Sequence, residues 1–378
     1  MTYTLVKITM GYEEYLEALY ASRPEMRTAS YAGQQAFVFG DAFGEADNLE
    51  RHLTRLGVEA HTVIANCAPM QDAWAREHGL DPRTVDILEA QLREYRPTVL
   101  FIHNCFRHDD AFIRRIRAQV PSVRLVVGWC GIGFNDEWTR RWTEFDAILT
   151  CNPTQHADLL AAGIPSEVVL HGFEEGNLAK LDAVAPGEDF DLLFTGSMIA
   201  SNDYHRGRIR ILEALVDEGL PLRIFSKPLP DPAVFPAKLL ERIEPPLYGL
   251  RMLAALRRAK VVFNSHLDGN GEYAGNSRLF EATGVGTCLL TDQKRNIAEL
   301  FEPDREIVTF SGAEDCARKA RRLLQDDALR RSIAQAGQKR TLANYTYADR
   351  ARAIHEFITG SLRAKQPRRV AGREGYIA

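Results

Sequence analysis

The sequence contains no long apolar run, no closely spaced cysteine pair and no excess of basic charge. No segment approaches about 18 uninterrupted apolar residues, and the start of the chain lacks an apolar stretch followed by a small-residue cleavage site. The six cysteines form no CxxC pair and no Cys/His spacing that suits zinc. Lys and Arg number 47 against 51 Asp and Glu, whereas nucleic-acid-binding proteins usually have a basic excess. We therefore expect a cytoplasmic protein with reduced cysteines, no membrane span and no nucleic-acid partner.

The composition is that of a globular protein large enough for two domains. The chain has 378 residues, of which 45% are hydrophobic, and a domain commonly has about 100–200 residues. Short apolar runs alternate with amphipathic stretches, a pattern typical of βα units around parallel sheets. The sequence therefore predicts an α/β protein with two Rossmann-like parallel-sheet domains that face each other across a cleft. We place an N-terminal domain at 1–172, a linker at 173–190, a C-terminal domain at 191–346 and a final helix with a basic tail at 347–378.

Apolar runs predict the strands, and helical periodicity predicts the helices between them. The opening residues TLVKITM and the helical stretch after them are interpreted as an added first strand and helix, and helices are expected at 45–56, 83–95 and 347–360. The tail after the last helix is either a solvated end or a docking segment. The other strands are expected at 36–40, 58–64, 98–103, 123–128, 146–150 and 167–171 in the first half, and at 191–195, 222–226, 260–264, 287–291 and 306–310 in the second.

The segment 261–292 is the most informative one. A strand is followed by a Gly-rich polar loop and by a helix that begins near Ser277. Asn276 or Ser277 can cap this helix, whose free N–H groups then form an anion site. A cation in the first helical turn is unfavourable unless an anion lies nearby, so Arg278 indicates a bound phosphate. In the alternative, Arg278 points to solvent or pairs with Glu272.

Glu281 follows Arg278 by three residues, on the same face of the predicted helix. A carboxylate there could accept hydrogen bonds from two sugar hydroxyls, such as those of a ribose. The same spacing favours an i,i+3 ion pair with Arg278 that has no functional meaning. Spacing alone leaves both interpretations open.

Several spaced motifs in this part of the chain identify a family. NSRLFEATGVGTCLLTD contains RxFEAxGxG followed by LLTD, and ELF, AGxxR and TYxxR follow in that order. Over about a third of the chain these motifs resemble the C-terminal domain of the CgeB-like, spore-maturation branch of the group 1 glycosyltransferases. The stretch from YAGQQ to AREHG also resembles the N-terminal domain that accompanies it.

The resemblance implies a GT-B fold, in which two Rossmann-like domains hold the donor and the acceptor. It implies transfer of a sugar from a nucleotide-diphosphate sugar to a glycan, a lipid-linked glycan or a protein. We expect a retaining reaction that needs neither a cofactor nor a metal. Two other functions stay open, namely a nucleotide-sugar epimerase of the same shape and a non-catalytic relative that binds a nucleotide sugar or a partner protein.

The resemblance also assigns residues of the predicted anion site. Glu281 corresponds to the carboxylate that binds the donor ribose, and Arg278 with the backbone at Asn276 and Ser277 would lie beside the diphosphate. Relatives often have a second Glu eight residues before this carboxylate, but the present chain has Tyr273 there. The sugar contact of that first Glu is therefore in doubt.

A second candidate for phosphate binding is the stretch TGSMIASNDYHRGR. The resemblance places such a glycine turn close to the donor diphosphate, with a basic residue from the helix that follows. This role falls to Gly196 and Ser197 with Arg206 or Arg208, and Lys227 beyond the next strand could reach the same site. In the alternative, the arginines form an ordinary solvated helix face.

Acid or base candidates in the first half are His103 and Asp136. His103 ends the strand TVLFIH, so it would lie at the edge of the cleft as an acceptor-side base, a sugar contact or a structural histidine. Asp136 follows a Gly-containing turn and is a second acid/base candidate.

No metal site is expected from the spacing of the acidic and histidine residues. Asp189 and Asp191 have DxD spacing but lie at the start of a strand, away from the carboxyl-end cleft. His205 and His266 have no partners at metal-ligand spacing.

Overall fold

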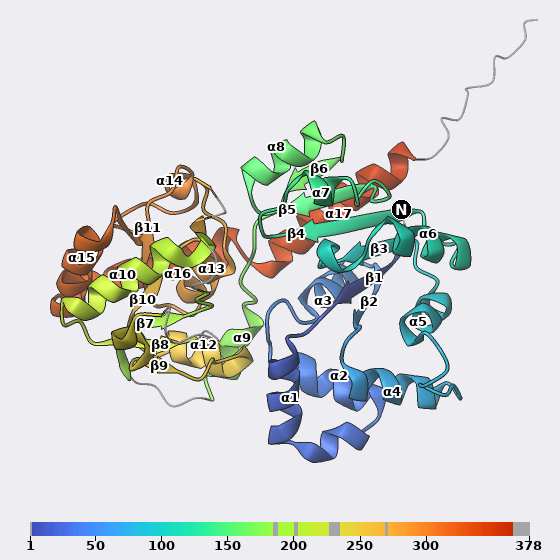
Figure 1. Ribbon diagram of the computed structural model, residues 1–378, viewed down its shortest axis with the longest axis horizontal. Coiled ribbons are helices and arrows are strands. Elements are labelled where there is room, and N and C mark those ends of the chain that lie inside the picture. The colour runs from blue at the N-terminus through green and yellow to red at the C-terminus, as the bar shows by residue number, and fades with distance from the viewer. Residues whose placement is uncertain (1, 184–187, 200–202, 227–234, 269–270, 366–378) are drawn as a thin grey trace, which may run out of the picture.

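Two parallel sheets of six strands each organise the chain, one in each half (Figure 1). The computed structural model describes residues 2–183, 188–199, 203–226, 235–268 and 271–365. Every strand pair in both sheets is parallel. The predicted α/β class with two parallel sheets is confirmed.

The first sheet has the strand order β2-β1-β3-β4-β5-β6. Strand β2 lies on one side of β1, and β3, the next strand along the chain, lies on the other side. The strand order therefore reverses between β1 and β3. In parallel sheets ligands bind beyond the carboxyl ends of the strands at such a reversal. The elements are β1 (Thr4–Thr9), α1 (Glu13–Ser22), η1 (Pro24–Thr28), α2 (Tyr31–Gly40), α3 (Asn48–Arg55), β2 (Glu59–Ile64), α4 (Ala68–Glu77), α5 (Ile87–Tyr95), β3 (Val99–Ile102), η2 (Cys105–Arg107), α6 (Asp110–Gln119), β4 (Leu125–Cys130), α7 (Asp136–Thr139), β5 (Ala147–Thr150), α8 (Pro153–Ala161) and β6 (Ser166–Val168).

Strand β1 is a central strand of this sheet, not an addition to it. Leu5 is in register with Ala60 on one side and with Val99 on the other. Its side chains are buried in two separate clusters, Leu5 in one and Val6 in the other, because helices cover both faces. A near-continuous apolar strand such as TLVKIT is what burial on both faces requires.

The strand predicted at 36–40 is wrong, because these residues end helix α2. Five apolar residues in a row cannot distinguish a buried strand from a buried helix turn by periodicity. The longer stretch does show the helical spacing, since Tyr31, Gln34 and Val38 are buried at intervals of three and four residues. Ser30 begins the helix by accepting a hydrogen bond from the backbone N–H of Gly33 at 3.2 Å. The helix predicted at 45–56 begins three residues later than expected, at Asn48.

The second sheet has the order β12-β11-β10-β7-β8-β9, and its reversal lies between β7 and β10. The five predicted strands of this half are present, and β9 was missed because two residues carry no detectable alternation. Its elements are α9 (Gly176–Leu181), β7 (Phe190–Thr195), η3 (Asp203–His205), α10 (Arg206–Asp217), β8 (Leu222–Phe225), α11 (Ala237–Leu240), β9 (Ile243–Glu244), α12 (Gly249–Arg257), β10 (Ala259–Asn264), α13 (Ser277–Gly284), β11 (Cys288–Asp292), α14 (Ile297–Leu300), β12 (Val308–Phe310), α15 (Ala313–Gln325), α16 (Asp327–Asn344) and α17 (Tyr347–Ala364).

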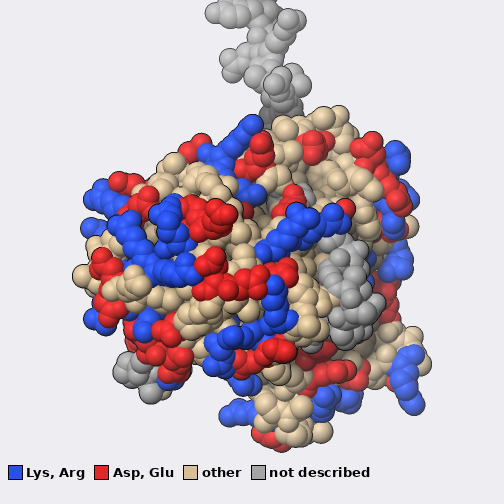
Figure 2. All heavy atoms as spheres, turned by 60° about the vertical axis from the view of Figure 1, so that its left-hand side comes forward, with Lys and Arg blue, Asp and Glu red and all other residues tan. Residues whose placement is uncertain are grey.

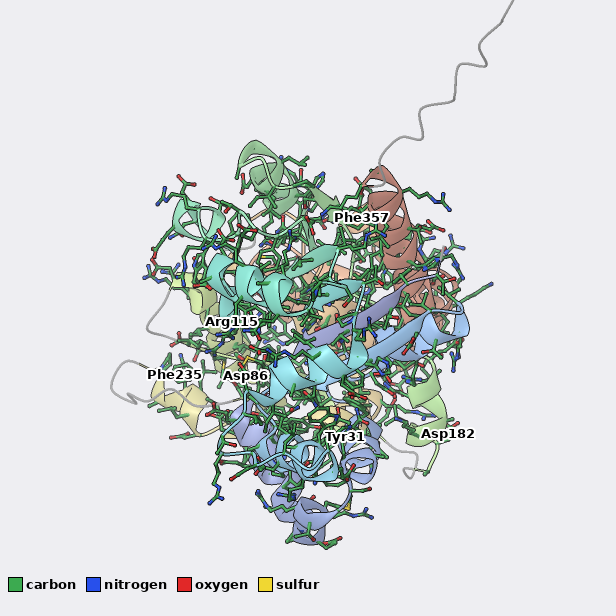
Figure 3. All side chains as sticks on the ribbon, turned by 90° about the vertical axis from the view of Figure 1, so that its right-hand side faces the viewer. Tyr31, Asp86, Arg115, Asp182, Phe235 and Phe357 are labelled. Atoms are coloured by element: carbon green, nitrogen blue, oxygen red, sulfur yellow. The ribbon has the colours of Figure 1, made fainter. Side chains whose placement is uncertain are left out.

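The last helix, α17, leaves the second half and packs on the first, as its red ribbon shows (Figure 1). Tyr347, Ile354 and Ile358 are buried in the same cluster as Leu49 of α3 and the first sheet. Phe357, labelled in Figure 3, packs against this cluster from the side. A capping box at Thr346 and Asp349 starts the helix at the point where the chain crosses between the halves.

The surface carries both signs of charge close together. On the face drawn in Figure 2, Lys and Arg side chains alternate with Asp and Glu side chains. Figure 3 shows one such pair, Asp86 and Arg115, whose charged atoms lie 3.4 Å apart. None of the helices in the described part of the chain has the length and apolar content needed to cross a bilayer. All six cysteines are buried, and none of them forms a disulfide in the structure.

Candidate functional site

Two neighbouring cavities lie where the strand order of the two sheets reverses. The larger cavity, of about 420 Å³, lies beyond β7 and is lined by Thr195, Gly196 and residues of both halves. The smaller cavity, of about 170 Å³, lies beyond β1 and β3 and includes Thr9 and His103. Tyr12, Phe43 and Gly44 line both cavities, so the two cavities are neighbours.

The larger cavity has a polar wall and an apolar wall. The polar wall consists of Ser197 in the turn after β7 and of Ser277, Arg278 and Glu281 in the first two turns of α13. The apolar wall comes mainly from the segments around β8, β9 and α12. Its residues are Phe225, Pro246, Leu247, Tyr248 and Met252.

Arg278 and Glu281 are adjacent at this cavity, and both are mostly buried. Arg278 Nη1 lies 2.7 Å from Glu281 Oε2, with 14% and 17% of the two side chains exposed. Arg278 Nη2 also donates to the carbonyl of Thr195 at 3.3 Å. Glu272 pairs instead with Arg295, so the alternative that Arg278 pairs with Glu272 or points to solvent is not what the structure has.

The ion pair leaves hydrogen-bonding capacity unused. Arg278 Nε and Nη1 and Glu281 Oε2 are buried, yet among the described residues none of these atoms has an aligned hydrogen-bond partner. Buried polar atoms in proteins are nearly always hydrogen-bonded, and exceptions concentrate where a ligand or water belongs. The i,i+3 pair that the spacing allows is present, and both residues line the larger cavity.

Asn276 caps α13 and fixes its start. Its side chain accepts from the backbone N–H of Leu279 at 3.3 Å and donates to Asn264 Oδ1 at 2.9 Å. The loop before it is held by His266, whose Nε2 accepts from the backbone N–H of Gly275 at 3.3 Å. These contacts tie the N-terminus of α13 to the carboxyl end of β10, which positions its free N–H groups at the cavity.

His266 in turn pairs with Asp292 at the end of β11. Nδ1 of His266 lies 2.7 Å from Asp292 Oδ1. Burial opposes the charge of Asp292, but the hydrogen bonds from the side chain and the backbone N–H of His266 hold the pKa of that carboxyl below its usual range. His266 is thus a structural residue of the loop before α13.

The two arginines of α10 have different surroundings. Arg208 is buried, and its guanidinium donates to the carbonyls of Ser197, at 2.8 Å, and of Ser265. Burial lowers the pKa of Arg208 to about 10. Arg206 is exposed and pairs with Asp203. Arg208 therefore holds the turn that carries Gly196 and Ser197, while Arg206 lies on the surface; Lys227 lies outside the described residues.

His103 meets a carboxylate that the sequence analysis did not single out. His103 Nε2 lies 2.9 Å from Glu45 Oε2, without the alignment of a hydrogen bond, and Nδ1 lies 3.3 Å from Thr9 Oγ1. Lys7 Nζ and His171 Nδ1 also approach Glu45, at 3.5 and 3.6 Å. Glu45 is thus the centre of a polar cluster at the floor of the smaller cavity.

The cluster strongly favours the charged form of its carboxylate. Burial alone would raise the pKa of Glu45, but His103 and Lys7 beside it hold that pKa well below its usual range. Lys7 could have indicated this cluster, because a lysine in the middle of the apolar strand TLVKIT needs a buried partner of opposite charge. Glu45 had no local signal, since it lies in a loop and meets its partners only in the folded chain.

The remaining candidate residues line neither of the two cavities. Asp136 is exposed at the first residue of α7 and lines neither of them. Asp189 and Asp191 lie at the amino end of β7 and pair with Arg258 and Lys260 at 2.6 and 2.7 Å. In the part of the chain that the structure describes, no group of three His, Cys, Asp or Glu residues could hold a metal ion.

Solved structures of other proteins share this architecture over nearly the whole chain. Sucrose-phosphate synthase from Thermosynechococcus elongatus has a TM-score of 0.60 at 12% identity, covering 96% of this chain and 100% of that one. HepE from Anabaena, solved in complex with UDP-glucose, has a TM-score of 0.58 at 10% identity, covering 95% of this chain and 100% of that one. AviGT4, a glycosyltransferase involved in avilamycin A biosynthesis, has a TM-score of 0.56 at 17% identity, covering 96% of this chain and 98% of that one. The fold is GT-B.

Sequence comparison gives a match confined to the second half. The model of the glycosyl transferase-like family matches residues 207–356, from α10 into α17. This range includes α13 with Arg278 and Glu281. No curated protein matches the chain.

Proposed function

We propose that this protein is a glycosyltransferase that moves a sugar from a nucleotide-diphosphate sugar to an acceptor. The observation that carries the proposal is the pair Arg278 and Glu281, two oppositely charged side chains that line the larger cavity. A diphosphate could bind the guanidinium of Arg278, and the hydroxyls of a ribose could donate hydrogen bonds to the carboxylate of Glu281. The glycosyl transferase-like match over the same segment supports this function.

The larger cavity supplies what the leaving group of such a reaction needs. Negative charge develops on the departing diphosphate, and the guanidinium of Arg278 with the N–H groups at the start of α13 would stabilise it. The apolar wall with Phe225 and Tyr248 offers a surface for the nucleoside base. Because HepE was solved with UDP-glucose, a uridine nucleotide is the first donor to test.

His103 is proposed as the group on the acceptor side, either as a base or as a sugar contact. Both of its ring nitrogens face protein groups, Glu45 and Thr9. An acceptor hydroxyl that replaces the Thr9 hydroxyl at Nδ1 could pass its proton to the imidazole, beside the charge of Glu45. Retention of configuration, independence from metal ions and membership of the CgeB-like branch are part of the proposal, and they rest on the resemblance of the motifs.

The decisive experiment measures nucleotide binding to matched arginine variants. Isothermal calorimetry with UDP, GDP, dTDP, CDP and ADP, each with and without magnesium, should find one nucleotide that binds the native protein. We expect Arg278→Ala to weaken it at least tenfold, since hydrogen bonds to charged groups are worth about 1.5–3 kcal/mol. The control is Arg305→Ala, which breaks an exposed i,i+3 pair with Glu302 and should leave affinity unchanged. Equal affinity in all three proteins would overturn the assignment of the site.

An epimerase remains the second candidate because of a specific structural neighbour. A putative UDP-N-acetylglucosamine 2-epimerase from Listeria monocytogenes has a TM-score of 0.51 at 15% identity, covering 97% of this chain and 98% of that one. Incubating the protein with UDP-N-acetylglucosamine and no acceptor distinguishes the two functions. An epimeric nucleotide sugar in the proton spectrum would favour the epimerase, whereas acceptor-dependent release of UDP from a sugar donor would favour the transferase. Nucleotide binding with neither reaction would favour the non-catalytic relative.

A further inference from the structure

The smaller cavity lies where an acceptor would have to sit, and its lining differs from that of the larger cavity. It opens beside Tyr12, Phe43 and Gly44, which also line the larger cavity. His103 and Glu45 form part of its wall. A group bound in this cavity would therefore be adjacent both to the proposed donor and to the proposed acceptor-side residue.

Most of the wall of this cavity is apolar. Helix α1 contributes two side chains, α2 contributes two, and the ends of β1 and β2 and the loop after α2 contribute the rest. The apolar residues are Met10, Tyr12, Tyr15, Leu16, Val38, Phe39, Phe43, Ala46 and Ile64.

Lys7, Tyr15 and Thr9 at the wall already have protein partners. Lys7 Nζ donates to the carbonyl of Ala46 at 3.2 Å and lies beside Glu45. The Tyr15 hydroxyl donates to Asp41 Oδ2 at 3.0 Å, and Thr9 Oγ1 lies 3.3 Å from His103 Nδ1. A sugar ring has a hydroxyl on nearly every carbon, and in this cavity few of them would find a partner. Each buried hydroxyl without a partner weakens binding.

The volume of the cavity suits one ring. An apolar cavity of about 150 Å³ can hold a benzene molecule, and this one measures about 170 Å³. A six-membered carbon ring therefore fits by size and by polarity, whereas a hexose fits only by size.

We infer that the smaller cavity binds an apolar group of the acceptor, of the size of one aromatic or cyclohexyl ring or a short alkyl chain. The nucleophilic hydroxyl of that acceptor then lies at the mouth of the cavity, beside His103 and the donor. The inference rests on the proposed function for the identity of the ligand as an acceptor. The preference of the cavity for an apolar ring stands on its lining alone.

The test compares two probes that have the same ring and differ in hydroxyl groups. Saturation-transfer NMR on the full chain measures binding of cyclohexanol and of myo-inositol, without nucleotide. We expect cyclohexanol to bind at millimolar concentration and myo-inositol to bind at least tenfold more weakly. Equal binding of the two probes, tighter binding of myo-inositol or no binding of cyclohexanol would overturn the inference.

A matched pair of valine variants locates the binding site of the probe. Val38 is buried at the wall of the smaller cavity, so Val38→Phe should fill it and weaken cyclohexanol binding at least fivefold. Val85 is partly exposed, away from both cavities, so Val85→Phe should bind cyclohexanol as the native protein does. If cyclohexanol binding is weakened equally in both variants, or is weakened in neither, the assignment of the binding site to this cavity is overturned. If Val38→Phe does not fold, the comparison of the two probes on the native protein still decides the polarity of the site.

The outcome is separable from that of the nucleotide experiment. Cyclohexanol binding without any nucleotide binding would retain the apolar cavity and remove the glycosyltransferase proposal. Nucleotide binding with a preference for myo-inositol would retain the glycosyltransferase proposal and remove the apolar acceptor.

Discussion

Glu45 shows how much one buried carboxylate can organise. Lys7, His103 and His171 all approach it within 3.6 Å, and Lys7 is 1% exposed. A buried ammonium without a partner would be costly, because desolvation disfavours the charged form. The contacts of this carboxylate therefore hold three side chains in place and fix the loop after α2, to which Glu45 belongs.

The charge of His171 makes the stability of the protein depend on pH. Burial opposes a charged imidazole here, but hydrogen bonds with Cys151 and Glu45 outweigh it and raise the pKa of His171 to about 10. The unfolded chain has a His pKa of about 6.5. The stabilisation is therefore complete below about pH 6.5 and is lost as pH rises towards 10.

We expect the free energy of unfolding of the native protein to fall more steeply between pH 6.5 and 10 than that of His171→Gln. Urea unfolding at a series of pH values measures this difference. His61→Gln is the control, because His61 lies nearer the surface and pairs with Glu59; its curve should parallel the native one. Parallel curves for His171→Gln would contradict the prediction.

At the scale of elements, the start of α12 rests on the loop that follows α2. The backbone N–H of Leu250 donates to the carbonyl of Asp41 at 2.7 Å. Tyr248 packs on Phe43 with ring centroids 5.3 Å apart, and Phe43 packs on Tyr15 at 4.0 Å. These contacts join the two halves beside the cavities, so the cleft depends on how closely α12 approaches this loop.

Gly249 permits that approach. Its φ is +54°, and a Cβ added there would lie 2.0 Å from Asp41 Oδ2. We expect Gly249→Ala to separate α12 from the loop, which would increase the radius of gyration and weaken nucleotide binding. Small-angle scattering and calorimetry measure the two effects.

The matched control for this change is Gly219→Ala. Gly219 has a φ of +70°, but a Cβ there would meet nothing within 4 Å. It should cost about 1–2 kcal/mol of stability from backbone strain alone, with no change in shape or nucleotide affinity. If both variants behave alike, the close approach of α12 has no role in the cleft.

At the scale of the whole molecule, α17 completes the core of the half that lies far from it in sequence. Its buried residues Tyr347, Ala351, Ile354, Ile358 and Leu362 share one cluster with strands of the first sheet. Lys365, just after the helix, donates to the carbonyl of Arg124 at 3.1 Å. The first sheet therefore has one face covered by residues near both ends of the chain.

A chain that ends after residue 346 should lose this cover and fail to fold in its first half. Removal of five buried side chains exposes the apolar face of the first sheet, since each would contribute on the order of 1–3 kcal/mol. We expect aggregation or a lower melting temperature in circular dichroism. A chain that ends after residue 365 keeps α17 and should melt as the full chain does. Equal melting of both truncated chains would show that α17 does not stabilise the first half.

Local sequence patterns were enough to predict α13 and most of the strands. Asn276 was one of two caps that the sequence offered, and the helix begins at Ser277, as predicted, and ends at Gly284. Helix caps and apolar runs depend on a few neighbouring residues, so they can be recognised in the sequence without knowledge of the tertiary contacts. The stretch 36–40 was misread because tertiary burial, not local periodicity, separates a buried strand from a buried helix turn.

The sequence by itself determined the α/β pattern, the start of α13 and the proximity of Arg278 to Glu281, because each depends on spacing along the chain. Only the tertiary structure decided that β1 is central, that Arg208 holds a turn while Arg278 faces a cavity, and that Glu45 meets Lys7. Strand order and burial depend on contacts between distant segments. The local sequence does not specify such contacts, because many distant partners would satisfy the same apolar run or the same single charge.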